Sequence, residues 1–171
     1  LNNTKNITSL MQLSQDASKV IFNLQRERGL SVGYIKGEDK KTLLLLNKQR
    51  TETNKVLKLF KYNIDIEKKI LNSMQKLTTI RNDITSIDIN SDKAFIFYTN
   101  LISNLLDIQN KIMLLSKDKD ISQMAHLNVK LLIAIENAGQ ERAILNGIFS
   151  GNKLTIKMFQ NFSFVHIRQI E

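Results

Sequence analysis

The chain has 171 residues and a formal net charge of +9, from 25 lysine and arginine residues against 16 aspartate and glutamate residues. It has no cysteine, which excludes disulfides and thiolate chemistry, and no proline, which favours long uninterrupted helices. Lysines are spread along every segment and aromatic residues make up only 6%, so we expect a surface that attracts small anions and no nucleic-acid partner. The length suits one hydrophobic core, and we expect residues 1–171 to form a single domain.

Apolar residues three and four positions apart predict six helical stretches. They cover approximately residues 6–36, 40–62, 67–84, 91–115 and 120–150, with a last stretch after Thr155. Residues 85–90 are polar and few, so we expect a loop there rather than a strand. Because the turns are short, consecutive helices are obliged to pack side by side. The sequence therefore predicts an all-α fold, an antiparallel helical bundle of the four-helix-bundle type with long helices.

Residues that commonly cap helices stand before several of these stretches: Asp39, Asn90 or Ser91, Asp120, and Thr155. Asp120 and Gln123 also have the spacing of a capping box, in which each side chain satisfies a backbone amide of the first turn. Gly37 and Gly151 each follow a long helical pattern, where glycine commonly supplies the left-handed turn that ends a helix. These signals place the ends of the predicted helices.

Two segments share a pattern, Leu24–Gly37 and Ala138–Gly151. Laid over each other without gaps, they have identical residues in four pairs: Glu27 and Glu141, Arg28 and Arg142, Gly33 and Gly147, Gly37 and Gly151. On a helix, one face carries Arg28 together with four apolar residues: Ile21, Leu24, Val32 and Ile35.

An arginine within an apolar stripe is unfavourable unless a counter-charge and hydrogen bonds satisfy it. Two interpretations stay open on this ground. In one, Arg28 pairs with Glu141 and Arg142 pairs with Glu27, which makes a structural lattice. In the other, the two guanidinium groups bind a small anion.

Residues for catalysis or metal binding have no comparable pattern. His126 and His166 stand in different predicted helices, with no carboxylate or cysteine at ligand spacing. The sequence has no phosphate-binding glycine loop, no dinucleotide fingerprint and no nucleophile elbow. We therefore expect no enzymatic activity, no metal and no cofactor.

Helical apolar patterns reach both ends of the chain, and we expect a sensor domain that is part of a larger receptor and lacks its closing helices. No apolar run approaches the roughly 20 residues that span a bilayer, so we expect no membrane insertion by this part of the protein.

Three stretches carry a resemblance to a known family: Gln25–Tyr34, Ala138–Ala143 and Gly151–Thr155. In this order and spacing they resemble the nitrate- and nitrite-sensing (NIT) domain family. The resemblance implies an all-helical input module, of the kind found on bacterial chemoreceptors, histidine kinases, cyclases and a cytoplasmic transcription antiterminator. Residues from about 40 to 124 match the family only as helix.

The resemblance also implies a site, in which nitrate is held between Arg28 and Arg142. Nitrate is planar with three acceptor oxygens, and a guanidinium group presents paired donors in one plane. Further candidates are three hydrogen-bond donors and two carboxylates that balance the charge: Ser31, Tyr34 and Asn146 as donors, Glu27 and Glu141 as carboxylates.

From these observations we expect the ligand-binding domain of a signal-transduction receptor, with nitrate or nitrite shifting the arrangement of the helices. The expected context is a membrane chemoreceptor for chemotaxis, dimeric when intact, with this domain extracytoplasmic in the periplasm and the protein in the inner membrane. Two alternatives are a structural or protein-interaction bundle with internal Arg–Glu pairs, and a cytoplasmic sensor domain of an RNA-binding antiterminator.

Overall fold

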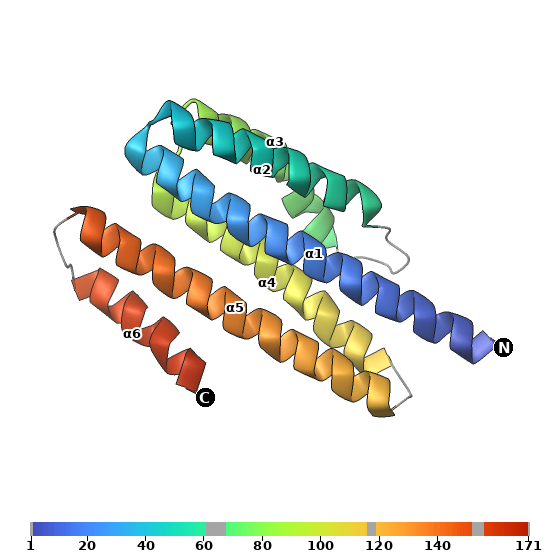
Figure 1. Cartoon of the computed structure of the whole chain (residues 1–171). Coiled ribbons are helices and arrows are strands. Elements are labelled where there is room, and N and C mark those ends of the chain that lie inside the picture. Colours follow the sequence, from blue (N-terminus) through green and yellow to red (C-terminus); the bar gives the residue numbers. More distant parts are fainter. Residues whose placement is uncertain (1, 61–67, 116–118, 152–155, 171) are drawn as a thin grey trace. The chain divides into compact units, whose positions relative to one another are not determined.

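The computed structural model describes residues 2–60, 68–115, 119–151 and 156–170, and in these ranges the chain is almost entirely helical, without strands. The helices in this part of the chain are α1 (Asn2–Gly37), α2 (Lys40–Leu59), α3 (Lys68–Thr85), α4 (Ser91–Leu115), α5 (Lys119–Gly151) and α6 (Ile156–Ile170) (Figure 1). The predicted all-α helical bundle is confirmed. The predicted end of the second stretch at residue 62 falls outside the described residues, within which α2 ends at Leu59.

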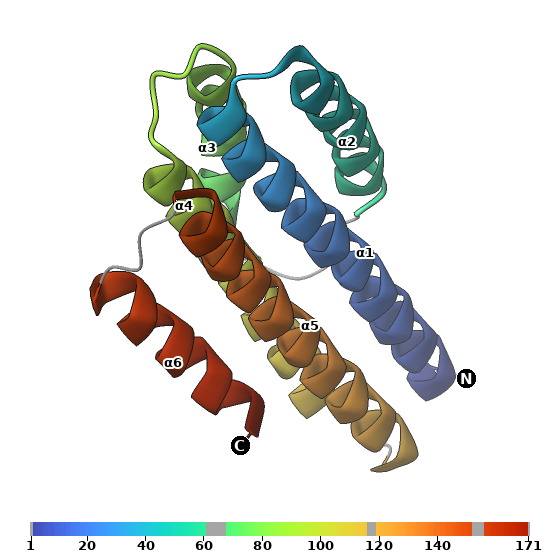
Figure 2. The same ribbon diagram turned by 60° about the vertical axis from the view of Figure 1, so that its left-hand side comes forward.

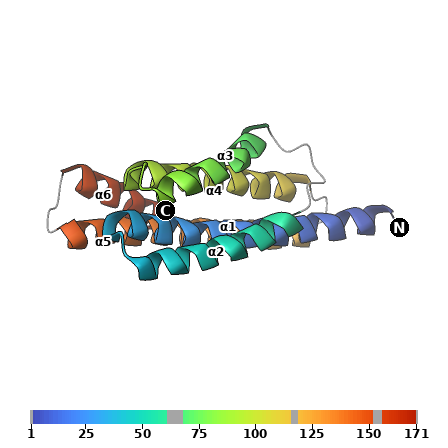
Figure 3. The same cartoon turned by 90° about the horizontal axis from the view of Figure 1, so that it is seen from above.

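The contacts divide the chain into two compact units, Leu1–His126 and Leu127–Glu171, and each is described here by itself. In the first unit α1 packs against α2 and α4, and α3 packs against α4. Seen from above, with the helices lying across the view, α1 and α2 lie on one side of this unit, and α3 and α4 lie on the other (Figure 3). The single domain that the sequence predicts stays a prediction.

The core of the first unit lies mainly between α1 and α4. Fully buried apolar residues recur at helical spacing along both helices: Ala17, Val20, Ile21 and Leu24 on α1, and Tyr98, Leu101, Ile102 and Leu105 on α4. Leu46 of α2 and Ile84 of α3 complete it. Burying one such side chain contributes about 1.5–3 kcal/mol, so this seam fixes which faces of α1 and α4 meet.

Buried polar groups set the lengthwise position of α1 against its neighbours. Gln109 of α4 donates to the backbone oxygen of Ser14 at 2.6 Å and accepts from the Ser14 hydroxyl at 2.7 Å. Gln49 of α2 donates to the side-chain oxygen of Asn23 at 2.9 Å. Sliding either helix by one turn would leave these buried groups unpaired, which is unfavourable.

The helix ends confirm some of the predicted capping residues and correct others. The side chains of Asp39 and Asn90 accept from the backbone amides of Thr42 and Lys93, each at 2.8 Å, as N-caps do. α1 ends at Gly37, one residue beyond the predicted end at residue 36, and the left-handed residue is Glu38, with φ of 50°, and not the glycine.

The capping box at Asp120 is wrong, because α5 begins at Lys119 and Asp120 already lies in its first turn. A carboxylate in the first turn is stabilised by the positive end of the helix dipole. The predicted cap at Thr155 and the chain after Gly151 lie outside the described residues.

The second unit comprises the greater part of α5 together with α6, which runs back beside it (Figure 2). Buried apolar residues of this unit come from both helices: Val129 and Leu132 from α5, and Val165 from α6. Over the residues that the structure describes, no helix is long and apolar enough to cross a membrane.

Candidate functional site

Arg28 lies buried on α1, with 2% of its surface exposed. Its Nη1 atom donates to the Thr99 hydroxyl at 2.9 Å, and its Cζ atom lies 4.9 Å from the centre of the Phe95 ring. Both partners come from α4 and stand four residues apart, so they share one face of that helix. The apolar surroundings predicted for this arginine are confirmed by Ile21 and Leu24, which are fully buried. α4 therefore supports one edge and one face of the Arg28 guanidinium group.

The neighbouring residue, Glu27, is the centre of a buried hydrogen-bond network. Arg81 of α3 donates from Nε to Oε1 at 2.7 Å and from Nη2 to Oε2 at 2.8 Å, which is the bidentate arrangement of an arginine–carboxylate pair. The Tyr98 hydroxyl of α4 donates to the same Oε1 at 2.7 Å. Burial, and then the charge and hydrogen bond of Glu27, raise the pKa of Tyr98, so its phenol keeps the proton that it donates.

A second arginine, Arg50 of α2, extends this network. Its Nη2 donates to the backbone oxygen of Arg81 at 2.9 Å, and its Nη1 donates to the Thr85 hydroxyl at 2.8 Å. Arg81 also donates from Nη1 to Asn54 of α2 at 2.7 Å. Burial lowers the pKa of Arg50. Burial also lowers the pKa of Arg81, but the hydrogen bonds and charge of Glu27 outweigh it and raise that pKa overall.

We call Glu27, Arg50, Arg81 and Tyr98 the Glu27 network. Its members come from α1, α2, α3 and α4 respectively, so it joins all four helices of the first unit. Because Arg28 follows Glu27 directly on α1, a network that fixes Glu27 also fixes the place of Arg28. The network therefore holds the backbone of α1 in place at Arg28, the predicted anion-binding arginine.

Two of the predicted secondary donors also lie in the first unit. Ser31 is fully buried beside the Tyr98 hydroxyl, and no hydrogen bond of standard geometry joins its own hydroxyl to a described residue. The Tyr34 hydroxyl donates to the backbone oxygen of Thr85 at 3.3 Å. The Ser31 hydroxyl thus faces Tyr98 without a hydrogen bond of standard geometry, whereas the donor of Tyr34 already has a protein acceptor.

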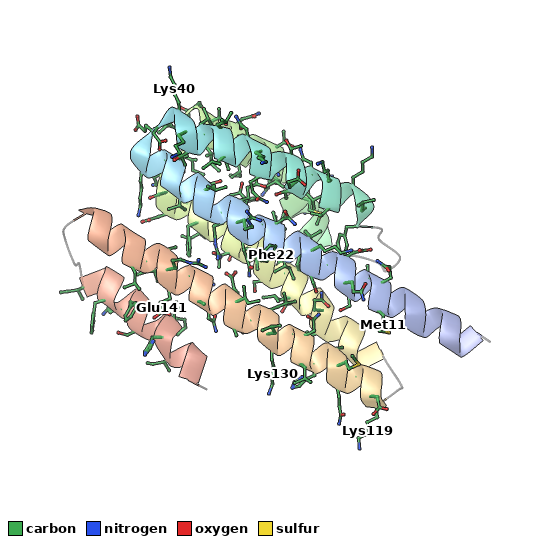
Figure 4. The ribbon with its side chains drawn as sticks, in the orientation of Figure 1. Met11, Phe22, Lys40, Lys119, Lys130 and Glu141 are labelled. Carbon is green, nitrogen blue, oxygen red and sulfur yellow. The ribbon has the colours of Figure 1, made fainter. Side chains whose placement is uncertain are left out.

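The remaining predicted site residues lie in the second unit, on α5. The Arg142 side chain is exposed within that unit. A carboxylate oxygen of Glu141 lies 3.4 Å from His166 Nδ1 of α6, and the His166 ring stacks on Phe162 with 5.7 Å between ring centres. Figure 4 labels Glu141 on the side of α5 along which α6 runs. The side chain of Asn146 lies outside those that the structure describes.

Arg28 and Arg142 belong to different units, and their approach to one ligand stays a prediction. The partner that the first unit gives Glu27 is Arg81, a residue that the sequence patterns above do not single out. A helical-wheel argument identifies it, because Arg81 shares one face of α3 with the buried residues Leu77 and Ile84. Among the residues that the structure describes, no group of histidine and carboxylate side chains is arranged to hold a metal ion.

Comparison with known proteins places the chain in a family. Residues 19–169 match the model of the family described as nitrate and nitrite sensing (NIT). Among solved structures, the chain is similar to that of the NasR transcription antiterminator, with a TM-score of 0.76 over 94% of this chain and 19% identity. The chain spans 48% of that protein, about half its length, and at this identity the similarity establishes the fold alone. Curated protein sequences give no match.

Proposed function

We propose that this chain, which belongs to the nitrate- and nitrite-sensing (NIT) family, is the input module of a bacterial signalling protein and binds one nitrate or nitrite ion between Arg28 and Arg142. The observation that carries the proposal is the way α4 holds Arg28. A guanidinium group that is 2% exposed and fixed by Thr99 and Phe95 is organised before the ligand arrives, which reduces the entropic cost of binding.

The chemistry of the residues suits this ligand. A guanidinium group offers paired donors in one plane, and nitrate accepts in one plane through its oxygens. We assign Arg142 as the second donor, from the equivalent position of the repeated pattern on α5. Ser31 is a secondary donor, because its buried hydroxyl has no acceptor of standard geometry among the described residues. Asn146 and Tyr34 are further donors, and Tyr34 has to exchange its bond to Thr85 to serve as one.

Charge balance is divided between the two carboxylates of the pattern. Glu27 offsets the positive charge of Arg81 through the bidentate pair. Glu141 stands next to Arg142 and supplies the negative charge on α5. The alternative structural bundle needs Glu27 to pair with Arg142, but both oxygens of Glu27 accept from Arg81, and one of them also accepts from Tyr98.

Binding signals through the helices that carry the two arginines. An ion that contacts both α1 and α5 favours the arrangement in which both contacts form, and it shifts the population of helix arrangements by that difference in affinity. α1 packs on α2 and α4, so a movement of α1 reaches every helix of the first unit.

We propose a membrane chemoreceptor as the whole protein, with this module outside the cytoplasm and two copies in the intact receptor. A cytoplasmic antiterminator is the second candidate, favoured by the fold shared with the NasR structure. Fusing alkaline phosphatase to the module within the full-length protein separates them, because the enzyme is active only outside the cytoplasm. Activity supports the receptor, and its absence supports the cytoplasmic protein.

Calorimetric titration with nitrate, nitrite, chloride and sulfate tests the site itself. We expect nitrate to bind wild type and to lose its binding heat in Arg28→Ala. The matched control is Arg26→Ala, which removes the same charge two residues away on the same helix. Arg26 is exposed, with its Cζ atom 5.9 Å from the Phe22 ring centre, and its loss leaves nitrate binding intact. Equal heats in wild type and Arg28→Ala, or no heat in either, contradict the nitrate site.

A further inference from the structure

We propose that Thr99 of α4 belongs to the anion site and donates a hydrogen bond to the ion bound at Arg28. This inference rests on the proposed function and adds a residue to it that no sequence pattern identifies. It comes from the hydrogen-bonding state of the Thr99 hydroxyl and from its position at the edge of the Arg28 guanidinium group.

The hydroxyl of Thr99 differs from those of three threonines on α2 and α3. Thr51, Thr53 and Thr85 each donate to the backbone oxygen four residues earlier, at 3.1, 3.0 and 2.8 Å. Thr99 instead accepts from Arg28 Nη1 at 2.9 Å, and no described residue accepts the hydrogen of its hydroxyl. A hydroxyl group carries one donor and two acceptor lone pairs, so its donor function remains for a ligand.

The geometry places that donor where an anion reaches Arg28. Because the Thr99 oxygen lies 2.9 Å from Nη1, an oxygen atom of a ligand on this edge comes within hydrogen-bond distance of both atoms. The Phe95 ring, 4.9 Å from Cζ, covers one face of the guanidinium group and excludes an approach from that side. A ligand at the edge next to Thr99 therefore lies in the plane of the guanidinium group and not against the covered face.

This arrangement suits an oxyanion such as nitrate or nitrite, whose oxygen atoms accept and never donate. Arg28 and Thr99 then present hydrogens to the same small group of acceptors. The residue acts by direct contact with the ion, in addition to holding the arginine.

Two substitutions separate the hydroxyl from the shape of the side chain. Thr99→Val keeps the volume and removes the hydroxyl, whereas Thr99→Ser keeps the hydroxyl. Ser103→Ala is the matched control, because Ser103 lies one turn further along α4 and is exposed. We expect the nitrate dissociation constant to rise about tenfold in Thr99→Val, as for one hydrogen bond to a charged group, and to stay near wild type in Thr99→Ser and Ser103→Ala. Thr99→Ala serves in place of the valine variant if far-UV circular dichroism shows that valine disturbs the fold.

Infrared difference spectra of bound nitrate distinguish direct contact from an effect through Arg28. We expect the N–O stretching bands to shift between wild type and Thr99→Val and to be preserved in Thr99→Ser. Unchanged affinity in Thr99→Val, or weaker binding with unchanged bands, overturns the role of Thr99 while Arg28→Ala still abolishes binding and the proposed function stands. No nitrate binding by wild type overturns the proposed function itself.

Discussion

Breaking the pair between Glu27 and Arg81 tests whether the Glu27 network holds the first unit together. The Glu27 side chain is fully buried, and that of Arg81 is 12% exposed. Substituting Arg81 by methionine leaves a buried carboxylate with Tyr98 as its hydrogen-bond donor. Removing one partner of a buried ion pair costs about 3–5 kcal/mol, so we expect Arg81→Met to lower the free energy of unfolding by that amount. For a chain of this size the midpoint of thermal unfolding falls by about 6–20 °C.

The double variant Glu27→Leu/Arg81→Met supplies the decisive comparison. Replacing both partners by apolar groups of similar size removes the unpaired charge, and such replacements are often neutral or stabilising. We expect the double variant to be more stable than Arg81→Met, with a midpoint below that of wild type because Tyr98 loses its acceptor. Urea unfolding followed by far-UV circular dichroism measures all three proteins.

The control is the exposed pair between Lys55 and Glu52 on α2, whose side chains are 63% and 49% exposed. Lys55→Met should change the free energy of unfolding by less than about 1 kcal/mol, because solvent screens such pairs. The reasoning is refuted if Arg81→Met matches this control, or if the double variant is less stable than Arg81→Met.

Three other variants test the fold. Leu101→Ala on α4 should lower the free energy of unfolding by about 2–5 kcal/mol in urea titrations, because Leu101 is fully buried. Gly29→Ala should raise the free energy of unfolding by up to about 1 kcal/mol, because an added Cβ meets nothing within 4 Å and alanine favours helix more than glycine. A lower free energy of unfolding in this variant would contradict the open space beside Gly29. The hydrogen bonds from the side chain and backbone of Thr42 lower the pKa of Asp39. The cap should therefore stabilise the start of α2 at pH values above the unfolded-state pKa of Asp39, and it should weaken as pH falls through the folded-state pKa. The weakening should appear as faster hydrogen exchange of the backbone amides in the first turn of α2. Asp39→Asn keeps an acceptor and should remove this pH dependence.

Helical periodicity predicted the elements because it is a local property. The apolar stripe of α1 identified the face that is buried, and it also identified Arg28 as an arginine within that face. The N-caps at Asp39 and Asn90 followed from residue type and position alone. The left-handed residue after α1 fell one position beyond the predicted glycine, since the exact end of a helix depends on how the chain enters the next turn.

The long-range partners were not predictable from periodicity. The spacing within a helix gives the face on which a residue lies but does not say which other helix meets that face. Glu27 and Arg81 are 54 residues apart, and no local signal joins them. The Tyr98 ring is fully buried, as an apolar position of α4 should be, but periodicity does not show that α4 also supports Glu27 through Tyr98 and Arg28 through Phe95.

We propose that Arg28 and Arg142 bind one ion together, and a nitrate titration of Arg142→Ala beside Arg28→Ala tests this most directly. Truncating one partner of a buried charge pair costs about 2–5 kcal/mol or more, so we expect each variant to lose about thirtyfold or more in affinity. Wild-type affinity in Arg142→Ala, with binding abolished in Arg28→Ala, would contradict a bridged ion and leave a site built by the first unit alone.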